Sequence, residues 1–172
     1  GDVPPSGRLA DTIAKNIEDY PCADCFGDGV ENIHKEDIYV GYRYFETFAK
    51  DKVLYPFGYG LSYTNFSIQP NFFHWDGEQL AVSVKVKNCG KVAGKEVVQL
   101  YKEAPQGTLG KPARELCGFA KTGELLPGEV QIVTIQCDRY YLASYDDSGV
   151  TGYPSAYVLE AGEYGFYAGT DV

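Results

Sequence analysis

The sequence contains no methionine, one tryptophan and only two histidines, His34 and His74, in 172 residues. Two imidazoles give little basis for a Ser-His-Asp triad or a histidine-rich metal site. No apolar run approaches the roughly 18 residues that a membrane-spanning helix requires, and no signal peptide opens the chain. Because Gly1 is not an initiator residue, we expect a piece of a longer polypeptide, so the missing targeting signals do not locate it.

Basic residues are also scarce: 15 lysines and arginines stand against 24 aspartates and glutamates, which gives a net charge of −9. An acidic chain is not attracted to nucleic acid or to an anionic membrane surface, and we predict neither as a partner. Neutral sugars are compatible with this charge. We interpret the densest acidic group, Asp28, Glu31, Glu36 and Asp37, as a solvated loop rather than a catalytic pair.

The cysteines are odd in number, and the chain is too long to depend on a disulfide framework. Cys22-x-x-Cys25 has metal or redox spacing, but a four-ligand zinc site needs a second such pair, which the sequence lacks. We therefore predict free thiols, no metal site and no cofactor, and free thiols favour a bacterial cytoplasm. The five are Cys22, Cys25, Cys89, Cys117 and Cys137.

Turn-forming and aromatic residues are abundant instead, with 20 Gly, 9 Pro and 15 Tyr. This composition is typical of a turn-rich β protein. Leu80, Val82, Val84 and Val86 alternate with small or polar residues, which predicts a strand with one buried face. Turn signals recur about every 8–15 residues from Leu61 onward, which fits about seven antiparallel strands. We predict an all-β antiparallel sandwich over residues 61–172.

The last part of the chain carries a second local pattern. Leu159, Gly162 and Tyr164 suit a tyrosine corner, in which the phenol bonds to backbone a few residues upstream. A plain hairpin with a core tyrosine would have much the same sequence. Both interpretations remain open at this point.

The first 60 residues differ from the sandwich. Residues 1–36 lack a periodic apolar face and predict an irregular arm that is partly mobile in isolation. Residues 37–60 carry a row of aromatic side chains, which predicts a linker docked on the sandwich. Ordering a backbone costs roughly 1–2 kcal/mol per residue, and each buried aromatic side chain offsets roughly 1.5–3 kcal/mol of that cost.

Motifs along the whole chain resemble one family. They are Ser6-Gly7-Arg8-Leu9, Tyr39-Val40-Gly41-Tyr42-Arg43-Tyr44-Phe45, Tyr55-Pro56-Phe57-Gly58-Tyr59-Gly60-Leu61-Ser62-Tyr63-Thr64, Glu96-Val97-Val98-Gln99-Leu100-Tyr101, Leu126-Pro127-Gly128-Glu129 and Gly162-Glu163-Tyr164. In this order they resemble the C-terminal part of glycoside hydrolase family 3 proteins, the β-glucosidase and β-xylosidase family. The resemblance implies the tail of an α/β-sandwich domain (1–36), a linker (37–60) and a fibronectin type III-like domain of immunoglobulin-like fold (61–172). The linker also resembles members whose catalytic barrel follows this domain, so the domain order stays open.

The resemblance implies a parent protein that hydrolyses β-glucosides by a retaining mechanism, with two carboxylates about 5–5.5 Å apart. In the family, the nucleophilic Asp lies in the barrel and the acid/base lies in the α/β domain before its tail. Neither position maps onto this chain, so we expect no catalytic residue here, no activity of this chain alone and the role of a non-catalytic structural module. Its expected partners are the catalytic barrel and the α/β domain of the same parent, through which alone it would meet the substrate.

The linker supplies candidates for the contact with those domains: Tyr42, Arg43, Tyr44, Phe57 and Tyr59. Aromatic rings offer adhesive area, and an arginine bridges polar groups. The alternative function is a carbohydrate- or protein-binding sandwich module, with Trp75 as a candidate for stacking on a sugar. Trp75 equally fits a cap on the sandwich edge, which we favour, and a free-standing binding module would have no use for the linker.

Overall fold

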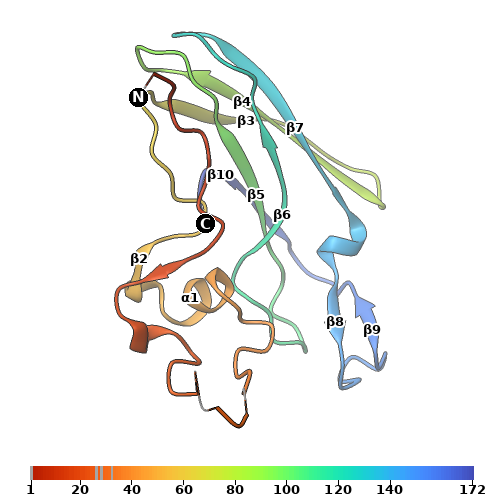
Figure 1. Ribbon diagram of the computed structural model, residues 1–172. Helices are drawn as coiled ribbons and strands as arrows, with labels where there is room; N and C mark the ends of the chain where they lie inside the picture. Colours follow the sequence, from red (N-terminus) through yellow and green to blue (C-terminus); the bar gives the residue numbers. More distant parts are fainter. Residues whose placement is uncertain (1, 26, 28, 32) are drawn as a thin grey trace.

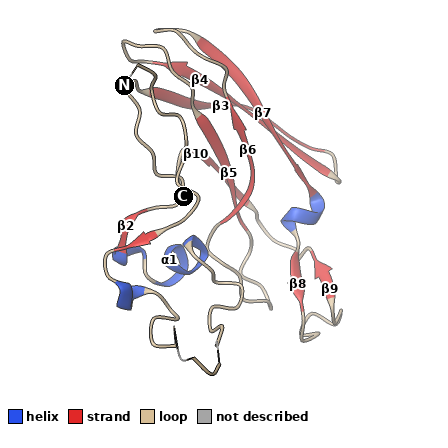
Figure 2. Ribbon diagram, viewed as in Figure 1, coloured by secondary structure: helices blue, strands red, loops and turns tan. Residues whose placement is uncertain are grey.

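The sandwich consists of two facing antiparallel sheets (Figures 1 and 2). The computed structural model describes residues 2–25, 27, 29–31 and 33–172. One sheet has the order β3 (Phe66–Trp75), β4 (Gln79–Asn88), β7 (Val130–Asp138), and the other has the order β10 (Gly165–Gly169), β5 (Val97–Glu103), β6 (Glu115–Lys121). The predicted all-β antiparallel sandwich is confirmed. Six described strands make up the two sheets, and residues 144–158 leave them to form a separate hairpin of β8 (Ser144–Asp146) and β9 (Ala156–Val158).

The core lies between the two sheets. All four apolar residues of β4 that were predicted to face inward belong to one buried cluster, together with Leu100 of β5, Cys117 of β6 and Ile135 of β7. Burying each large aliphatic side chain is worth roughly 1.5–3 kcal/mol. The cluster therefore gives the sandwich a hydrophobic core of its own, as an independently folding domain requires.

Strand β3 lies at one edge of its sheet. Its pairing with β4 shifts register between Pro70 and Phe72, so a bulge interrupts the strand. Phe72 and Phe73 follow the bulge and are both largely exposed. The edge thus combines a proline, a bulge and two aromatic side chains.

Asn88, the last residue of β4, is fully buried and uses its whole amide group. Its Oδ1 accepts hydrogen bonds from the Thr64 hydroxyl at 2.6 Å and the Gly90 N–H at 3.0 Å. Its Nδ2 donates to the carbonyl oxygens of Val92 and Leu125, both at 2.8 Å. One side chain thereby joins the entry to β3, the turn after β4 and the segment that leads to β7.

The tyrosine corner is confirmed. The Tyr164 hydroxyl donates a hydrogen bond of 3.1 Å to the carbonyl oxygen of Glu160, four residues upstream. Burial raises the pKa of the Tyr164 phenol, so it remains a donor at neutral pH. This bond fixes the chain just before β10.

The arm and the linker fold against each other beside the sandwich (Figure 1). Strand β1 (Ile13–Ala14) of the arm pairs antiparallel with β2 (Val53–Tyr55) of the linker. Helix α1 (Tyr42–Phe48) precedes β2. Short 3₁₀ helices occupy Ile17–Asp19, Lys50–Lys52 and Arg139–Leu142.

A second, smaller core holds these segments together. Phe45 of α1 is only 1% exposed and packs with Ala14 and Ala49. The ring of Tyr20 meets the Phe45 ring edge-on at 5.6 Å between centroids. The Tyr20 hydroxyl accepts from the Ala14 N–H at 3.1 Å and donates to the Thr12 carbonyl oxygen at 3.2 Å. Residues 12–20 of the arm therefore pack on α1 through Tyr20 and pair with β2. The partial mobility of the arm as a whole stays a prediction.

Three further predictions concern the thiols, membrane-spanning helices and the acidic residues of the arm. All five cysteines are free thiols in the structure. Over the described part of the chain, no helix is long and apolar enough to cross a membrane. Of the acidic group in the arm, Asp28 lies outside the described residues, Glu31 and Asp37 are exposed and Glu36 is half-buried.

Candidate interdomain contact site

The linker is attached to the sandwich by an aromatic contact. The ring centroids of Tyr42 and Phe57 lie 4.7 Å apart, and Tyr42 meets the buried ring of Tyr101 on β5 at 6.1 Å. The Tyr42 hydroxyl accepts the N–H of Leu116 on β6 at 2.8 Å. Two of the predicted contact residues, Tyr42 and Phe57, therefore face the sandwich of this same chain.

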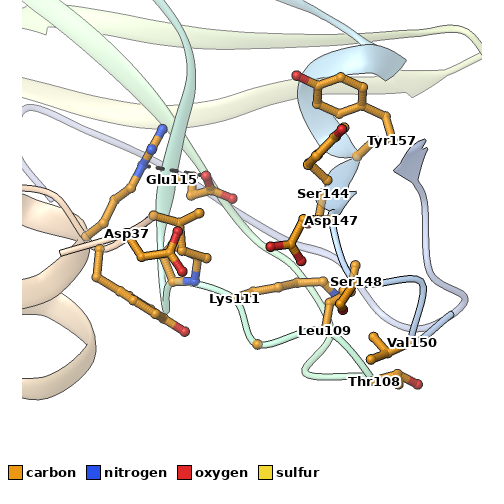
Figure 3. A pocket seen from close by; sticks show the side chains of 17 residues that line it. Asp37, Thr108, Leu109, Lys111, Glu115, Ser144, Asp147, Ser148, Val150 and Tyr157 are labelled. Carbon is orange, nitrogen blue, oxygen red and sulfur yellow. Dashed lines mark ion pairs between the residues drawn. The ribbon is translucent and has the colours of Figure 1, made fainter. Parts of the chain in front are cut away.

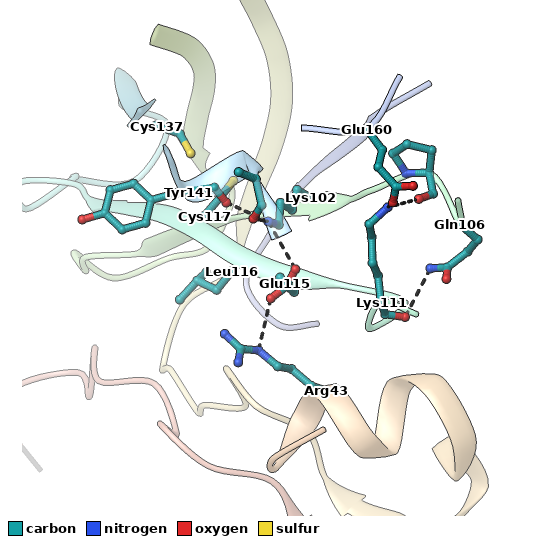
Figure 4. A network of polar contacts seen from close by, with 12 residues as sticks. Arg43, Lys102, Gln106, Lys111, Glu115, Leu116, Cys117, Cys137, Tyr141 and Glu160 are labelled. Atoms are coloured by element: carbon teal, nitrogen blue, oxygen red, sulfur yellow. Dashed lines mark hydrogen bonds and ion pairs between the residues drawn. The ribbon is translucent and has the colours of Figure 1, made fainter. Parts of the chain in front are cut away.

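Arg43 begins a chain of charges that runs into the sandwich (Figure 4). Its Nε lies 3.5 Å from Glu115 Oε1, and the other Glu115 oxygen lies 3.2 Å from the Nζ of Lys102. The buried Lys102 ammonium also donates to the carbonyl oxygens of Tyr141 at 2.7 Å and Ala143 at 3.4 Å. Arg43 thus bridges polar groups, as predicted for it, but those groups lie on β5, β6 and the segment before β8.

Tyr44 and Tyr59 have a different environment. The Tyr44 ring packs with Phe45 at 5.3 Å and Phe48 at 5.8 Å, and the Tyr59 ring packs with Tyr55 at 4.8 Å. Both side chains are half-buried. Their ring partners belong to the linker itself, whereas Tyr42 also meets Tyr101 of the sandwich.

The arm adds a second attachment. Arg8 donates through Nε to Glu96 Oε1 at 3.1 Å and through Nη2 to the same oxygen. The Leu9 N–H donates to the Tyr59 carbonyl oxygen at 2.8 Å, and the Gly58 N–H donates to the Leu9 carbonyl oxygen at 2.8 Å. Glu96 is the first residue of the predicted Glu96–Tyr101 motif and is buried, so this motif anchors the arm as well as starting β5.

The two glycines of the aromatic motif lie where other backbone segments come too close to leave room for a side chain. Gly58 has φ +87°, and a Cβ there would lie 2.6 Å from the carbonyl oxygen of Thr170. A Cβ on Gly60 would lie 2.9 Å from the carbonyl oxygen of Gly7. Arm, linker and C-terminal residues therefore meet at a junction that has no room for a side chain.

The linker also exposes large apolar side chains that the sequence did not single out as contact residues. Phe48, Leu54 and Tyr55 are each exposed, and so is Leu61, which directly follows the linker. Their apolar character was visible in the sequence, but their outward direction depends on how α1 and β2 turn in space. Aromatic and aliphatic side chains grouped on a surface are typical of an interface.

Trp75, the candidate for sugar stacking, lies at the end of β3 and is 38% exposed. It lines a hollow of about 270 Å³ together with Phe73, Leu80, Tyr164 and Phe166. Nearly all of these side chains are apolar, so the hollow offers a sugar hydroxyl few partners. This environment is that of an edge cap, and stacking on a sugar stays a prediction.

A polar cleft of about 660 Å³ lies between the start of the linker, residues 108–112 and the β8–β9 hairpin (Figure 3). Its walls are far apart in the chain, so no local motif predicted it. Lys111, in its floor, is buried and donates to the Pro105 carbonyl oxygen at 2.6 Å and to Glu160. The lining includes Asp37, Tyr39, Arg43, Tyr145, Asp147 and Tyr157.

The hairpin wall of the cleft is organised by the buried carboxylate of Asp146. Asp146 accepts from the N–H groups of Gly149 at 2.7 Å and Thr151 at 2.9 Å, and from the Thr151 hydroxyl at 2.6 Å. These bonds favour the charged form and lower the pKa of Asp146 to about 2 from 3.8, the Thr151 hydroxyl contributing most. The loop between β8 and β9 therefore depends on a carboxylate.

This carboxylate predicts an acid transition of the hairpin. Because the pKa is lowered on folding, the stabilisation is complete above pH 3.8 and is lost as the pH falls through about 2. In an NMR titration, we expect the Thr151 amide shift to move with a midpoint near pH 2. The Asp146→Asn variant should lack this transition. A midpoint at or above pH 3.8 in the unaltered chain would contradict stabilisation of the carboxylate by these hydrogen bonds.

Comparison with known proteins places this geometry in a family. Residues 96–172 match the fibronectin type III-like domain model. A β-glucosidase from Ruminococcus albus is 56% identical over 172 residues, covering 100% of this chain and 18% of that protein. A solved β-glucosidase from Paenibacillus barengoltzii superimposes with a TM-score of 0.96 at 57% identity, over 100% of this chain and 19% of that one. A GH3 β-glucosidase from Bifidobacterium adolescentis gives a TM-score of 0.87 at 36% identity, over 99% and 25%.

The chain matches the fibronectin type III-like part of glycoside hydrolase family 3 β-glucosidases, as its motifs indicated. It spans about a fifth of the length of the curated relatives it matches, 18% of the first and 23% of a second from Butyrivibrio fibrisolvens. The matches extend over the arm and linker as well as the sandwich, since they cover 100% of the chain. In the part of the chain that the structure describes, no group of three or more His, Cys, Asp or Glu side chains is arranged to hold a metal ion.

Proposed function

We propose that this chain is a non-catalytic structural module that braces the catalytic barrel and the α/β domain of a parent protein that hydrolyses β-glucosides. The observation that carries the proposal is the two-sided linker. It bonds to the sandwich through Tyr42 and Arg43, while its Phe48, Leu54 and Tyr55 are exposed, as is Leu61 directly after it. A segment that is fixed on one side and apolar on the other suits a joint between domains.

Its parts follow the sequence boundaries. The arm, residues 1–36, is proposed as the tail of the α/β domain, residues 37–60 as the linker and residues 61–172 as the fibronectin type III-like domain. The remaining four-fifths of the relatives' length supplies the surfaces that the exposed linker side chains would contact. Tyr44 and Tyr59, which are half-buried within the linker, complete this proposed contact.

The ionisation of the carboxyl groups supports a non-catalytic role. A general acid in a glycosidase requires a raised pKa. Wherever a described carboxyl has a clearly shifted pKa, the shift is downward, and a hydrogen bond to the charged form is the largest cause. These groups are Asp19, Asp24, Glu36, Asp76, Asp146 and Glu160.

The first test is an activity assay of the purified 172-residue chain. A retaining mechanism needs two carboxylates in one site, and neither of the family's positions maps onto this chain. We therefore expect no release of aryl alcohol from an aryl β-glucoside above the buffer rate. Turnover that copurifies with the chain and follows its concentration would overturn the assignment.

A graft tests the bracing role. In the Ruminococcus albus β-glucosidase, the matching segment is deleted in one variant and replaced by this chain in another. The deletion should lose activity or thermal stability, and the graft should restore it, because the 56% identity keeps the joint compatible. Deletion without any effect on activity or unfolding temperature would contradict a bracing role.

A further inference from the structure

The cleft between the linker and the β8–β9 hairpin has the size of a ligand site. Its volume of about 660 Å³ lies within the roughly 300–1,000 Å³ that is typical of small-molecule pockets. Three separate parts of the chain line it: residues 37–43, residues 108–112 and the hairpin. In Figure 3, Asp37 comes from the linker side and Asp147 from the hairpin side.

The walls are held by hydrogen bonds and ion pairs within the chain. Asp146 fixes the hairpin loop, the Lys111–Glu160 pair fixes the floor, and Glu115 holds Arg43. A polar site that is ordered before the ligand arrives loses less freedom on binding. The cleft is therefore organised without any ligand.

Two carboxylates remain available. Neither Asp37 nor Asp147 accepts a hydrogen bond or forms an ion pair with any residue that the structure describes. Asp37 also has φ +50°, an uncommon backbone conformation for a residue other than glycine. Such carboxylates accept strong hydrogen bonds from hydroxyl groups.

Two aromatic rings line the same cleft as these carboxylates. Tyr145 and Tyr157 are 51% and 54% exposed, and their ring centroids are 5.1 Å apart. Rings that are exposed and supported by each other offer a rigid apolar platform. Rings together with hydroxyl acceptors match a pyranose, which has apolar faces and a rim of hydroxyl donors. Arg43 and Lys111 also line the cleft, but each is paired with a glutamate, so the unpaired carboxylates disfavour an anionic ligand.

We propose that this cleft binds a neutral oligosaccharide of β-linked glucose. The choice of β-linked glucose rests on the proposed function of the parent, whereas the neutral sugar chemistry rests on the cleft. The ring of Tyr157 packs on a pyranose face, and the Asp147 carboxylate accepts hydrogen bonds from its hydroxyl groups. The segment would thus hold a glucan chain near the enzyme that cleaves it.

Calorimetric titration of the 172-residue chain with cellotetraose tests the proposal. We expect saturable binding in the millimolar range, weakened about tenfold or more by Tyr157→Ala and by Asp147→Asn. Tyr153→Ala is the matched control, because Tyr153 is exposed on the same hairpin but does not line the cleft. Each variant must keep the unfolding midpoint of the unaltered chain.

Three results would overturn the proposal: no saturable binding, binding that both cleft variants retain, or equal binding of the α-linked maltotetraose. Trp75 is the single tryptophan, so its fluorescence reports sugar binding at the competing site on the β3 edge. A change in its emission, together with loss of binding in Trp75→Phe, would place the sugar at the β3 edge instead. Failure here would leave the graft experiment unaffected, so the two proposals fail separately.

Discussion

Asn88→Ala is expected to lower the free energy of unfolding of the sandwich by about 3–5 kcal/mol. The side chain is fully buried and makes four hydrogen bonds. Alanine leaves the buried Thr64 hydroxyl without its acceptor and removes one partner each from the Gly90 N–H and the Val92 carbonyl. An unsatisfied buried group costs about 1–3 kcal/mol, and the lost amide also leaves a cavity. In thermal unfolding followed by circular dichroism, the midpoint should fall by about 10 °C or more.

Asn65→Ala provides the control for this substitution. Asn65 has the same side chain and lies one residue after Thr64, but it is exposed. Its replacement should change stability by no more than about 0.5 kcal/mol. If Asn88→Ala were as mild as Asn65→Ala, water would be replacing the lost bonds, and the buried amide would not be joining the three segments.

Phe45→Ala is expected to release the arm and linker while the sandwich stays folded. Truncating a buried phenylalanine costs about 3–5 kcal/mol, and Phe45 is at the centre of the smaller core. Amide hydrogen exchange should accelerate about 10²–10³-fold at Lys15 and Ala49, whose N–H groups bond to Lys52 and Phe45. Exchange at Val84 and Ile135 in the sandwich should change little.

Phe48→Ala is the matched control, because Phe48 lies on the same helix but is 61% exposed. It should leave exchange at Lys15 nearly unchanged. An equal loss of protection in β4 and β7 with Phe45→Ala would show that arm, linker and sandwich unfold as one unit. That result would contradict the division between residues 37–60 and the domain that follows.

The sequence predicted what depends on neighbours in the chain. The alternation in β4 was enough to identify its buried face, and the spacing of Leu159, Gly162 and Tyr164 was enough to suggest the tyrosine corner. Helix α1 was not predicted, because Tyr42, Phe45 and Ala49 share a face over only two turns, and β-branched and aromatic residues have low helix propensity. Contacts within the fold stabilise this seven-residue helix.

The candidate site was less accessible to sequence analysis. The aromatic linker residues were recognised by type, but the direction of each ring was not predicted. Tyr42 packs against Tyr101 of the sandwich, whereas Phe48 is exposed. The cleft was missed because residues 37–43 and the β8–β9 hairpin meet only after the sheets have formed. Nothing in the sequence marks Tyr145 or Tyr157 of this cleft as a ligand contact.

The edge strand β3 has a consequence for the protein in solution. An open strand edge with exposed phenylalanines is a template on which a second molecule can add its own strand, and repetition of that step leads to fibrils. Pro70 offers no N–H for such pairing, and the bulge between Pro70 and Phe72 breaks the regular spacing that a foreign strand would need. The strand thereby resists self-association at the place where its side chains would otherwise promote it.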